Sequence, residues 1–404
     1  MAQEPSLSQL VGATAMVSGT AIGAGMLAIP SLTTYAGFYP SLLTSFACWL
    51  LMSCTGLLLV EACLWEKDSE VCHFHSIAER FLGYPGKILI TLLFLFFYYC
   101  LMIAYFSGLS PYFHDLVHLF GFNLSLWQSI LAVCFISTFL LSLRTAIIDK
   151  VNLTLTVGLV LSFIALIRGG FAGVDAEKLS YSNWSHILTA APIMLGAFGY
   201  HNVVPTVSKY LGFHIKSTRL VIFIGSFLPF VFYTIWQWIV LGNVAHEQIV
   251  GAANAHGVPI VEMMKSPDGN LETWHWLIYA FCFFAIITSF IGVGFSIVDF
   301  LGDNLRKYKP NSFILSILTL LPPALIVCAK PDIFLKAFGV ASGIGGTMLN
   351  GFFPIIVVAI GVYRHKLKTR SPLLSNPFVL GLMVLLALLV IAAELNIFST
   401  APKF

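Results

Sequence analysis

Glycine and proline residues interrupt two long apolar stretches of the sequence in the same way. The first interruption spans Gly19–Gly25 and precedes Pro30, and the second spans Gly196–Asn202 and precedes Pro205. Inside a helix each glycine costs about 1 kcal/mol and a proline about 3 kcal/mol relative to alanine, so we expect both helices to break. At each break one half-helix exposes N–H groups and the other exposes carbonyl groups. These dipoles predict a site for a small solute with a positive and a negative end, such as an amino acid zwitterion.

The two breaks supply the polar contacts of this predicted site. Because glycine and alanine allow close backbone approach, we expect the solute carboxylate to accept N–H groups near Ala21 and Gly23–Gly25. The solute ammonium group is expected to face carbonyl groups near Phe198 and Gly199. No arginine or lysine falls in the middle of a predicted span, which favours a solute without net charge.

Aromatic residues near the breaks are expected to form the pocket for the solute's side chain. Tyr98, Tyr99 and Tyr105 lie on the third predicted span, and Phe284 and Phe290 lie on the eighth. Aromatic residues make up 14% of the chain, so helix packing is the alternative explanation for any one of them. The predicted binding residues are Ala21, Gly23, Ala24, Gly25, Tyr98, Tyr105, Phe198, Gly199, Tyr200, His201 and Ser289.

A zwitterion gains nothing from the membrane potential, so its uphill uptake requires a co-transported cation. One charge that crosses about 100 mV supplies about 2.3 kcal/mol. For a proton, the candidate carriers within predicted spans are Glu61, His201 and Asp299. The two acids lie near span ends and can instead reach the interface, and the histidine can instead be a neutral hydrogen-bonding group.

Sodium is the alternative coupling ion. The carbonyl groups of Gly19 and Ala21, with the hydroxyl groups of Thr288 and Ser289, offer a shell of oxygen atoms between the first and eighth spans. Hydroxyl pairs are also common where membrane helices pack, so packing is the competing explanation. The sequence leaves proton and sodium coupling both open.

The elements that position these residues are predicted to be helices in a lipid bilayer. The 404-residue chain is 58% hydrophobic and 10% charged, with a mean hydropathy of +0.90, which excludes a soluble multidomain protein. At roughly 35 residues per span and loop about eleven helical spans fit, so the expected fold class is an all-α membrane protein. The net charge of +3 is too small and too dispersed for a nucleic-acid partner.

The distribution of lysine and arginine predicts the orientation of these spans. With the N-terminus in the cytoplasm, fifteen of the 21 basic residues fall on the cytoplasmic side, as the positive-inside rule requires. The C-terminus is then outside. The ninth span is short and carries Pro322 and Pro323, and a re-entrant segment there would reverse every later span. The predicted spans are residues 10–36, 40–65, 87–112, 126–144, 147–168, 186–211, 219–243, 274–300, 312–329, 333–363 and 375–398.

The two breaks fall in the first and sixth predicted spans. An interval of five spans gives the second copy the opposite orientation, which is typical of secondary transporters with inverted repeats. We therefore expect a leucine-transporter-like core of five plus five helices. Residues 1–168 form the first predicted repeat, residues 169–365 form the second, and residues 366–404 form a peripheral eleventh helix.

Other kinds of chemistry are not indicated. The eight cysteines lack CxxC spacing and Cys72–His75 has no second group of ligands, so no metal site or disulfide framework is expected. Gly339–Gly343 is one residue off the GxSG spacing and no general base accompanies it, so no catalytic residue or enzyme activity is expected. A channel is disfavoured because no ring of acidic residues is present. No cofactor is predicted beyond the co-transported ion.

Four stretches of the sequence are similar to a known transport family. The chain resembles the hydroxy/aromatic amino acid permease family of the amino acid–polyamine–organocation superfamily, and within it the bacterial tyrosine-specific permeases. The FGYHNVVP motif is the more specific signal, because related permeases share the glycine-rich first stretch. The four stretches are AMVSGTAIGAGMLAIP at Ala15–Pro30, AFGYHNVVPTVSKY at Ala197–Tyr210, TSFIGVGFSIVDFLGD at Thr288–Asp303 and TLLPP at Thr319–Pro323.

The resemblance implies an eleven-span protein of the bacterial inner membrane that imports primarily tyrosine, with tryptophan or phenylalanine as secondary substrates, together with protons. A tryptophan-selective permease of the same family and a sodium-coupled neutral amino acid symporter are the alternatives. Some proton-coupled members of the superfamily use a lysine in the fifth span, and Val151–Ile167 contains none. The expected partners are an aromatic amino acid and the lipid bilayer, and a monomer is compatible with this function.

Overall fold

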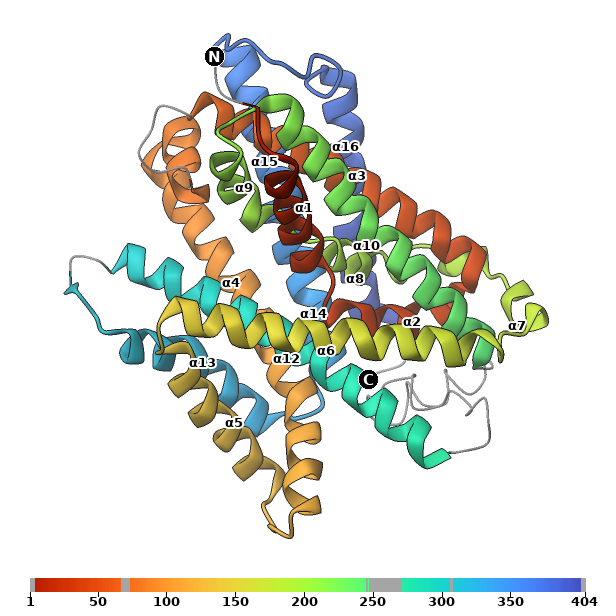
Figure 1. Cartoon of the computed structure of the whole chain (residues 1–404). Coiled ribbons are helices and arrows are strands. Elements are labelled where there is room, and N and C mark those ends of the chain that lie inside the picture. The colour runs from red at the N-terminus through yellow and green to blue at the C-terminus, as the bar shows by residue number, and fades with distance from the viewer. Residues whose placement is uncertain (1–3, 67–72, 245, 247–270, 306–307, 401–404) are drawn as a thin grey trace.

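The chain folds into helices, as the sequence predicts. A computed structural model describes residues 4–66, 73–244, 246, 271–305 and 308–400, and all regular secondary structure in these ranges is helical (Figure 1). Short 3-10 helices are η1 (Trp184–His186) and η2 (His201–Val203), and π-helices are η5 (Ala341–Phe352) and η6 (Ile360–Arg364). The α-helices are α1 (Leu7–Ala21), α2 (Gly25–Ala36), α3 (Phe38–Trp65), α4 (Phe74–Leu119), α5 (Leu126–Leu141), α6 (Thr145–Phe171), α7 (Ala176–Ser180), α8 (Ala191–Ala197), α9 (Val204–Tyr210), α10 (Ile215–Asn243), α12 (Leu271–Asn304), α13 (Ser312–Ala329), α14 (Phe334–Val340), α15 (Phe353–Ala359) and α16 (Pro377–Thr400).

Most of the predicted spans correspond to long apolar helices. Among the described residues, eight helices are long and apolar enough to cross a membrane, or nine if the bent pair α1 and α2 is one span. The predicted spans 126–144 and 186–211 correspond to α5, which has 16 residues, and to the short elements α8, η2 and α9. The chain is a multi-pass membrane protein, and the count of eleven spans, their orientation and the inverted repeat stay predictions.

Both predicted helix breaks are confirmed. Helix α1 ends at Ala21 and α2 begins at Gly25, with a bend of 54° between them. Helix α8 ends at Ala197, η2 follows from His201, and α9 begins with Val204 and Pro205 in its first turn. Proline suits that position because the first N–H groups of a helix have no acceptor within it.

The third predicted span lies within helix α4, which contains a kink. The 46 residues of α4 contain non-helical backbone at Gly83 (φ 72°), which divides the element into two helices at a kink, and the predicted span 87–112 lies within the second. The predicted span begins at Lys87, whose side chain forms an ion pair of 2.7 Å with Glu79 on the other side of the kink. Charged residues at a helix end can extend beyond the hydrocarbon, which explains why the helical segment before Gly83 falls outside the predicted span.

The packing of the helices brings the two breaks together. Helix α1 packs against α10, and α8 packs against both α2 and η5. Helix α6 lies across the molecule against α12, as Figure 1 shows. The broken segments are therefore enclosed by other helices, which is where a membrane protein tolerates unpaired backbone groups.

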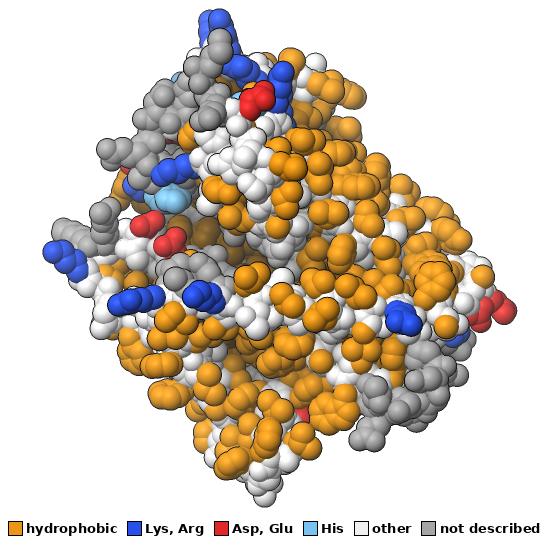
Figure 2. Space-filling view, in the orientation of Figure 1, with side chains coloured by type: hydrophobic (Ala, Val, Ile, Leu, Met, Phe, Trp, Pro, Cys, Tyr) orange, Lys and Arg blue, Asp and Glu red, His pale blue; other side chains and the backbone are white. Residues whose placement is uncertain are grey.

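The outer surface is strongly apolar. Figure 2 shows hydrophobic side chains over most of the visible face, with most of the visible lysine and arginine near its upper and left-hand edges. Exposed large side chains include Phe135, Leu153, Leu161 and Phe171. Soluble monomers rarely expose contiguous apolar patches larger than a few hundred Å², so contact with lipid explains this surface.

Candidate functional site

The first break places the N-terminus of α2 beside a side chain of α12. The Ser289 hydroxyl accepts the Ala24 N–H at 3.0 Å and donates to the Ala285 carbonyl at 3.1 Å. The N–H of Gly25, at the first position of α2, has no acceptor within its own helix. The predicted donors of this break therefore lie at a helix N-terminus, where an anionic group is stabilised.

The glycines of the first break allow contacts that a side chain would prevent. A Cβ atom at Gly23 would lie 2.0 Å from the Ser289 hydroxyl oxygen. A Cβ atom at Gly25 would lie 3.0 Å from the Cβ of Ala197 and 3.1 Å from the ring of Phe338. Close packing against α12 and α8 therefore explains why this part of the chain is rich in glycine.

The Tyr200 and His201 side chains of the second break contact α3. The Tyr200 hydroxyl donates to the Met52 carbonyl at 3.1 Å, and the His201 Nε2 atom lies 2.9 Å from the Thr55 hydroxyl. Both side chains are fully buried against α3. Phe198 is also buried. Tyr200 and His201 therefore connect the second break to α3 in this structure.

Tyr233 of α10 connects the two breaks. Its hydroxyl lies 2.7 Å from the Ala21 carbonyl and 3.0 Å from the Ala197 carbonyl, which are the last residues of α1 and α8. Its ring packs against Phe198, with 5.3 Å between the ring centroids. One side chain thus satisfies carbonyl groups that both broken helices leave without an intrahelical partner.

A cavity of about 60 Å³ lies between the two breaks. Tyr98 and Tyr105 of α4 and Phe338 of α14 form an aromatic part of its wall, and Asn202 and Asn350 contribute two side-chain amides. Binding of a solute there stays a prediction. Eight of the predicted binding residues line this cavity: Ala21, Gly23, Ala24, Gly25, Tyr98, Tyr105, Gly199 and Ser289.

The cavity is small for the predicted solute. Pockets for small molecules usually enclose roughly 300–1,000 Å³. The wall is built from both parts of the first broken helix together with α4, α8, α12, α14 and η5. An aromatic amino acid therefore fits only after some of these helices have moved apart.

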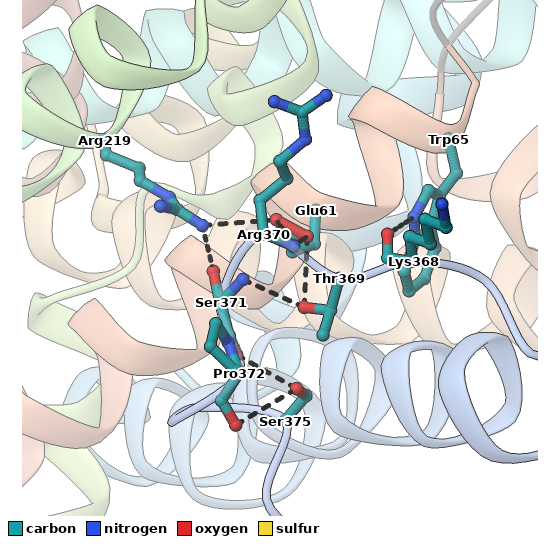
Figure 3. Close-up of polar contacts among 9 residues, drawn as sticks. All are labelled: Glu61, Trp65, Arg219, Lys368, Thr369, Arg370, Ser371, Pro372 and Ser375. Atoms are coloured by element: carbon teal, nitrogen blue, oxygen red, sulfur yellow. Dashed lines mark hydrogen bonds and ion pairs between the residues drawn. The ribbon is translucent and has the colours of Figure 1, made fainter.

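Glu61 of α3 belongs to a polar network outside the cavity, shown in Figure 3. Its carboxylate accepts a hydrogen bond from the Arg219 guanidinium at 3.2 Å and from the Arg370 backbone N–H at 2.9 Å. The Thr369 hydroxyl donates to the same carboxylate at 3.3 Å. With 1% of its surface exposed, Glu61 ties the segment before α16 to α3 and α10.

The other candidates for ion coupling also lie outside the cavity wall. Asp299 is an exposed residue of α12. The Thr288 hydroxyl donates to the Phe284 carbonyl of its own helix at 2.8 Å. His201 is held by α3, as described above. A role of any of them in coupling stays a prediction.

The cysteine and histidine cluster is only partly described. Cys72 lies outside the described residues, and the rings of His73 and His75 stack with 5.6 Å between their centroids. In the described ranges no group of three or more histidine, cysteine, aspartate or glutamate residues is arranged to hold a metal ion.

Four polar side chains that the structure places in or near the cavity or in a buried position are not predicted as functional from the sequence. Asn202 and Asn350 line the cavity, Tyr233 bridges the breaks, and Glu394 is a buried carboxyl group in α16. The glutamate and the two asparagines could have been recognised in the sequence, because polar residues within apolar spans are rare. Tyr233 could not, because tyrosine is common in this chain.

The chain is similar in sequence to several known transport proteins. The chain is 28% identical to "Tyrosine-specific transport system 2" of Haemophilus influenzae over 89% of each chain. It is 28% identical to the "Tryptophan-specific transport protein" of the same organism, over 98% of this chain and 97% of the relative. It is 26% identical to "Glutamine transporter 2" of Aliivibrio fischeri, over 96% of this chain and 99% of the relative.

The family assignment follows from a match over nearly the whole chain. The sequence profile of the tryptophan/tyrosine permease family matches residues 6–394. The relatives are transport proteins, so the chain is a permease and not an enzyme. With its two broken helices around one central cavity, this chain belongs to the tryptophan/tyrosine permease family.

Proposed function

We propose that this permease imports an aromatic amino acid, most readily tyrosine, across the bacterial inner membrane by proton symport. The observation that carries the proposal is that both helix breaks border one cavity, with glycine backbone on one side and aromatic side chains on the other. Alternating access then arises when helices around this cavity move apart first on one side and then on the other.

The carboxylate and the ammonium group of a zwitterion can each bind backbone groups that form hydrogen bonds with the hydroxyls of Ser289 and Tyr233 in this structure. The Ala24 N–H, now bonded to Ser289, and the neighbouring Gly25 N–H suit a carboxylate. The Ala21 and Ala197 carbonyls, to which Tyr233 donates, suit an ammonium group. Because each hydroxyl can rotate, it can yield these partners to a solute without leaving its helix.

The cavity wall favours an aromatic side chain with a polar end. Phe97, Tyr98 and Phe338 offer ring surfaces, and ring pairs contribute about 0.5–1.5 kcal/mol beyond burial. The side-chain amides of Asn202 and Asn350 can form hydrogen bonds with a phenol or an indole. The names of the tyrosine- and tryptophan-specific relatives support this class of solute.

The proposal includes the finer architecture. It comprises eleven spans with the N-terminus inside and the C-terminus outside, and inverted repeats over residues 1–168 and 169–365 with a peripheral helix over residues 366–404. The positive-inside distribution and the matching breaks in the first and sixth predicted spans support it. The protein needs no cofactor other than its co-transported ion.

A transport assay with the purified protein in liposomes tests this function. Competition by each of the twenty amino acids against labelled tyrosine identifies the solute, and pH and sodium gradients are imposed separately. We expect tyrosine, tryptophan and phenylalanine to compete and an acidic outer solution to drive accumulation. Dependence on sodium at constant pH would instead assign coupling to the oxygen atoms near Thr288 and Ser289. Competition by glutamine alone would overturn the aromatic assignment.

A further inference from the structure

One buried carboxyl group has no part in the site described so far. Glu394 of α16 is 3% exposed and is the one charged residue of a 24-residue helix that is otherwise uncharged. Within the described ranges its carboxylate forms no ion pair and no hydrogen bond. An ionisable residue inside a membrane helix is expensive to place there, and this points to a role in function.

Two glycines make room for this side chain. A Cβ atom at Gly339 of α14 would lie 3.1 and 3.2 Å from the two carboxylate oxygens of Glu394. A Cβ atom at Gly343 of η5 would lie 2.8 Å from the Cγ of Glu394 and 2.9 Å from the Cβ of Pro192 in α8. The acid therefore sits in a slot whose walls belong to the tenth predicted span and to the first half of the broken sixth.

The surroundings of Glu394 contain little charge to compensate an ionised carboxylate. Helices α8, α15 and η5, which pack against α16, contain no acidic, basic or histidine residue. Helix α14 carries Lys336, which is exposed, and α3 carries Glu61, which is bound to Arg219 and the segment before α16. On insertion scales a charged side chain costs about 2.5–3.5 kcal/mol at the centre of a membrane helix, and a buried carboxylate without a partner is unfavourable nearer the end as well, so the neutral carboxylic acid suits this slot.

Helix α14 contributes neighbouring residues to the slot and to the transport cavity. Gly339 follows Phe338, which lines the cavity. On the same side Ser342 has a buried hydroxyl that, in the part of the chain described, has no hydrogen-bond partner. A Cβ atom at Gly196, which also lines the cavity, would lie 1.9 Å from that hydroxyl. Any movement of α14 and η5 that opens the cavity therefore also changes the surroundings of Glu394.

We propose that Glu394 is the residue that binds and releases the co-transported proton, an inference that rests on the proposed proton symport. In the packed arrangement the side chain is a neutral carboxylic acid against Gly339. Loss of the proton to solution leaves a carboxylate, which is stable only where α16 separates from α14 and η5 far enough to admit water. Protonation and helix movement are thereby linked, and no other reactant is required.

Glu394→Gln in the full-length permease, reconstituted in liposomes, tests this inference. Glutamine imitates the neutral acid but cannot exchange a proton. We expect counterflow of labelled tyrosine at equal pH to stay within about twofold of wild type, and accumulation driven by an acidic outer solution to fall at least about tenfold. Glu177→Gln changes an exposed carboxylate of α7 and serves as the matched control, which should behave as wild type.

The outcomes separate this inference from the proposed function. If wild type accumulates tyrosine with acid outside and Glu394→Gln does so equally, the inference is wrong and symport stands. If wild type responds to sodium alone, the symport proposal itself fails. Should the glutamine variant lose counterflow as well, infrared spectra decide. The spectrum of the wild type must then contain a protonated-carboxyl band that changes when tyrosine is added, and the spectrum of Glu177→Gln must contain the same band. If the wild-type spectrum lacks this band, the inference is wrong.

Discussion

The hydroxyl group of Tyr233 lies 2.7 Å from the carbonyl oxygen of Ala21, at the point where the first broken helix ends. The same hydroxyl lies 3.0 Å from the carbonyl of Ala197, where the second broken helix ends. Two segments far apart in the chain therefore share one hydrogen-bond donor on α10. Displacement of either break must break or remake this contact.

Tyr233→Phe should destabilise the permease because two buried carbonyl groups lose their donor. An unsatisfied buried polar group costs about 1–3 kcal/mol, and we expect a loss of this size in the free energy of unfolding. Chemical unfolding in detergent micelles measures it. Tyr363→Phe removes a hydroxyl that donates to the Ser375 carbonyl from a half-exposed ring and should have a smaller effect. Equal losses of unfolding free energy in the two variants would show that the contacts of Tyr233 with the two breaks stabilise the fold no more than the Tyr363 hydrogen bond does.

Gly25→Leu and Gly199→Leu should abolish uptake while the protein still inserts into the membrane. A Cβ atom at Gly25 would already lie 3.0 Å from the Cβ of Ala197, and one at Gly199 would lie 2.9 Å from the Gly196 carbonyl oxygen. We expect a loss of at least about 100-fold, equivalent to about 2.7 kcal/mol of barrier. Uptake by membrane vesicles with matched protein amounts measures it.

The control for these glycine variants is Gly381→Leu. Gly381 is exposed on α16, and a Cβ atom there would meet no other atom within 4 Å. We expect normal uptake from this variant. Saturable uptake at the wild-type rate in both cavity variants would contradict the proposed site.

Asn350→Leu should weaken the distinction between tyrosine and phenylalanine. A site that forms a hydrogen bond with a substrate hydroxyl rejects the analogue without it, and leucine has a similar size but no amide. We expect the ratio of kcat/KM for tyrosine to that for phenylalanine to fall about tenfold, measured by uptake of each labelled amino acid. Asn304→Leu, at an exposed position of α12, should leave the ratio unchanged. An unaltered ratio in Asn350→Leu would remove this amide from tyrosine recognition.

Glu61→Gln should reduce stability and leave proton coupling intact. The substitution removes the charge that pairs with Arg219, and Arg219 is about one-third exposed, so solvent screens part of the interaction. We expect a loss of about 1–3 kcal/mol in unfolding free energy, with accumulation per folded molecule within about twofold of wild type. Normal stability with lost accumulation would instead assign the proton to Glu61.

Much of the fold is predictable from the sequence because its determinants are local. The glycines of Gly19–Gly25 and Gly196–Gly199, with Pro205, weaken the helix wherever they stand, and both breaks occur where they do. The limits of α4 are less predictable, because its helical segment before Gly83 carries charged residues such as Glu79, which a search for charge-free stretches passes over.

The details of the cavity depend on contacts between distant segments. Tyr200 and His201 lie in the second break as predicted, yet their partners on α3 draw both side chains out of the cavity. Asn350 enters it because η5 packs beside α8. Glu394 stands out in its apolar helix, but the glycine slot around it comes from residues that periodicity in one helix cannot bring together.

The tight space between the breaks has a consequence for selectivity. If the cavity is wide enough for a solute in only about one permease molecule in a hundred, the apparent Kd is about a hundredfold higher than the contacts alone would give. An indole needs a wider cavity than a phenyl ring. Tryptophan therefore binds to a smaller fraction of the permease molecules than phenylalanine does. Discrimination in this permease therefore reflects how far each solute requires the helices to part as well as which atoms it touches.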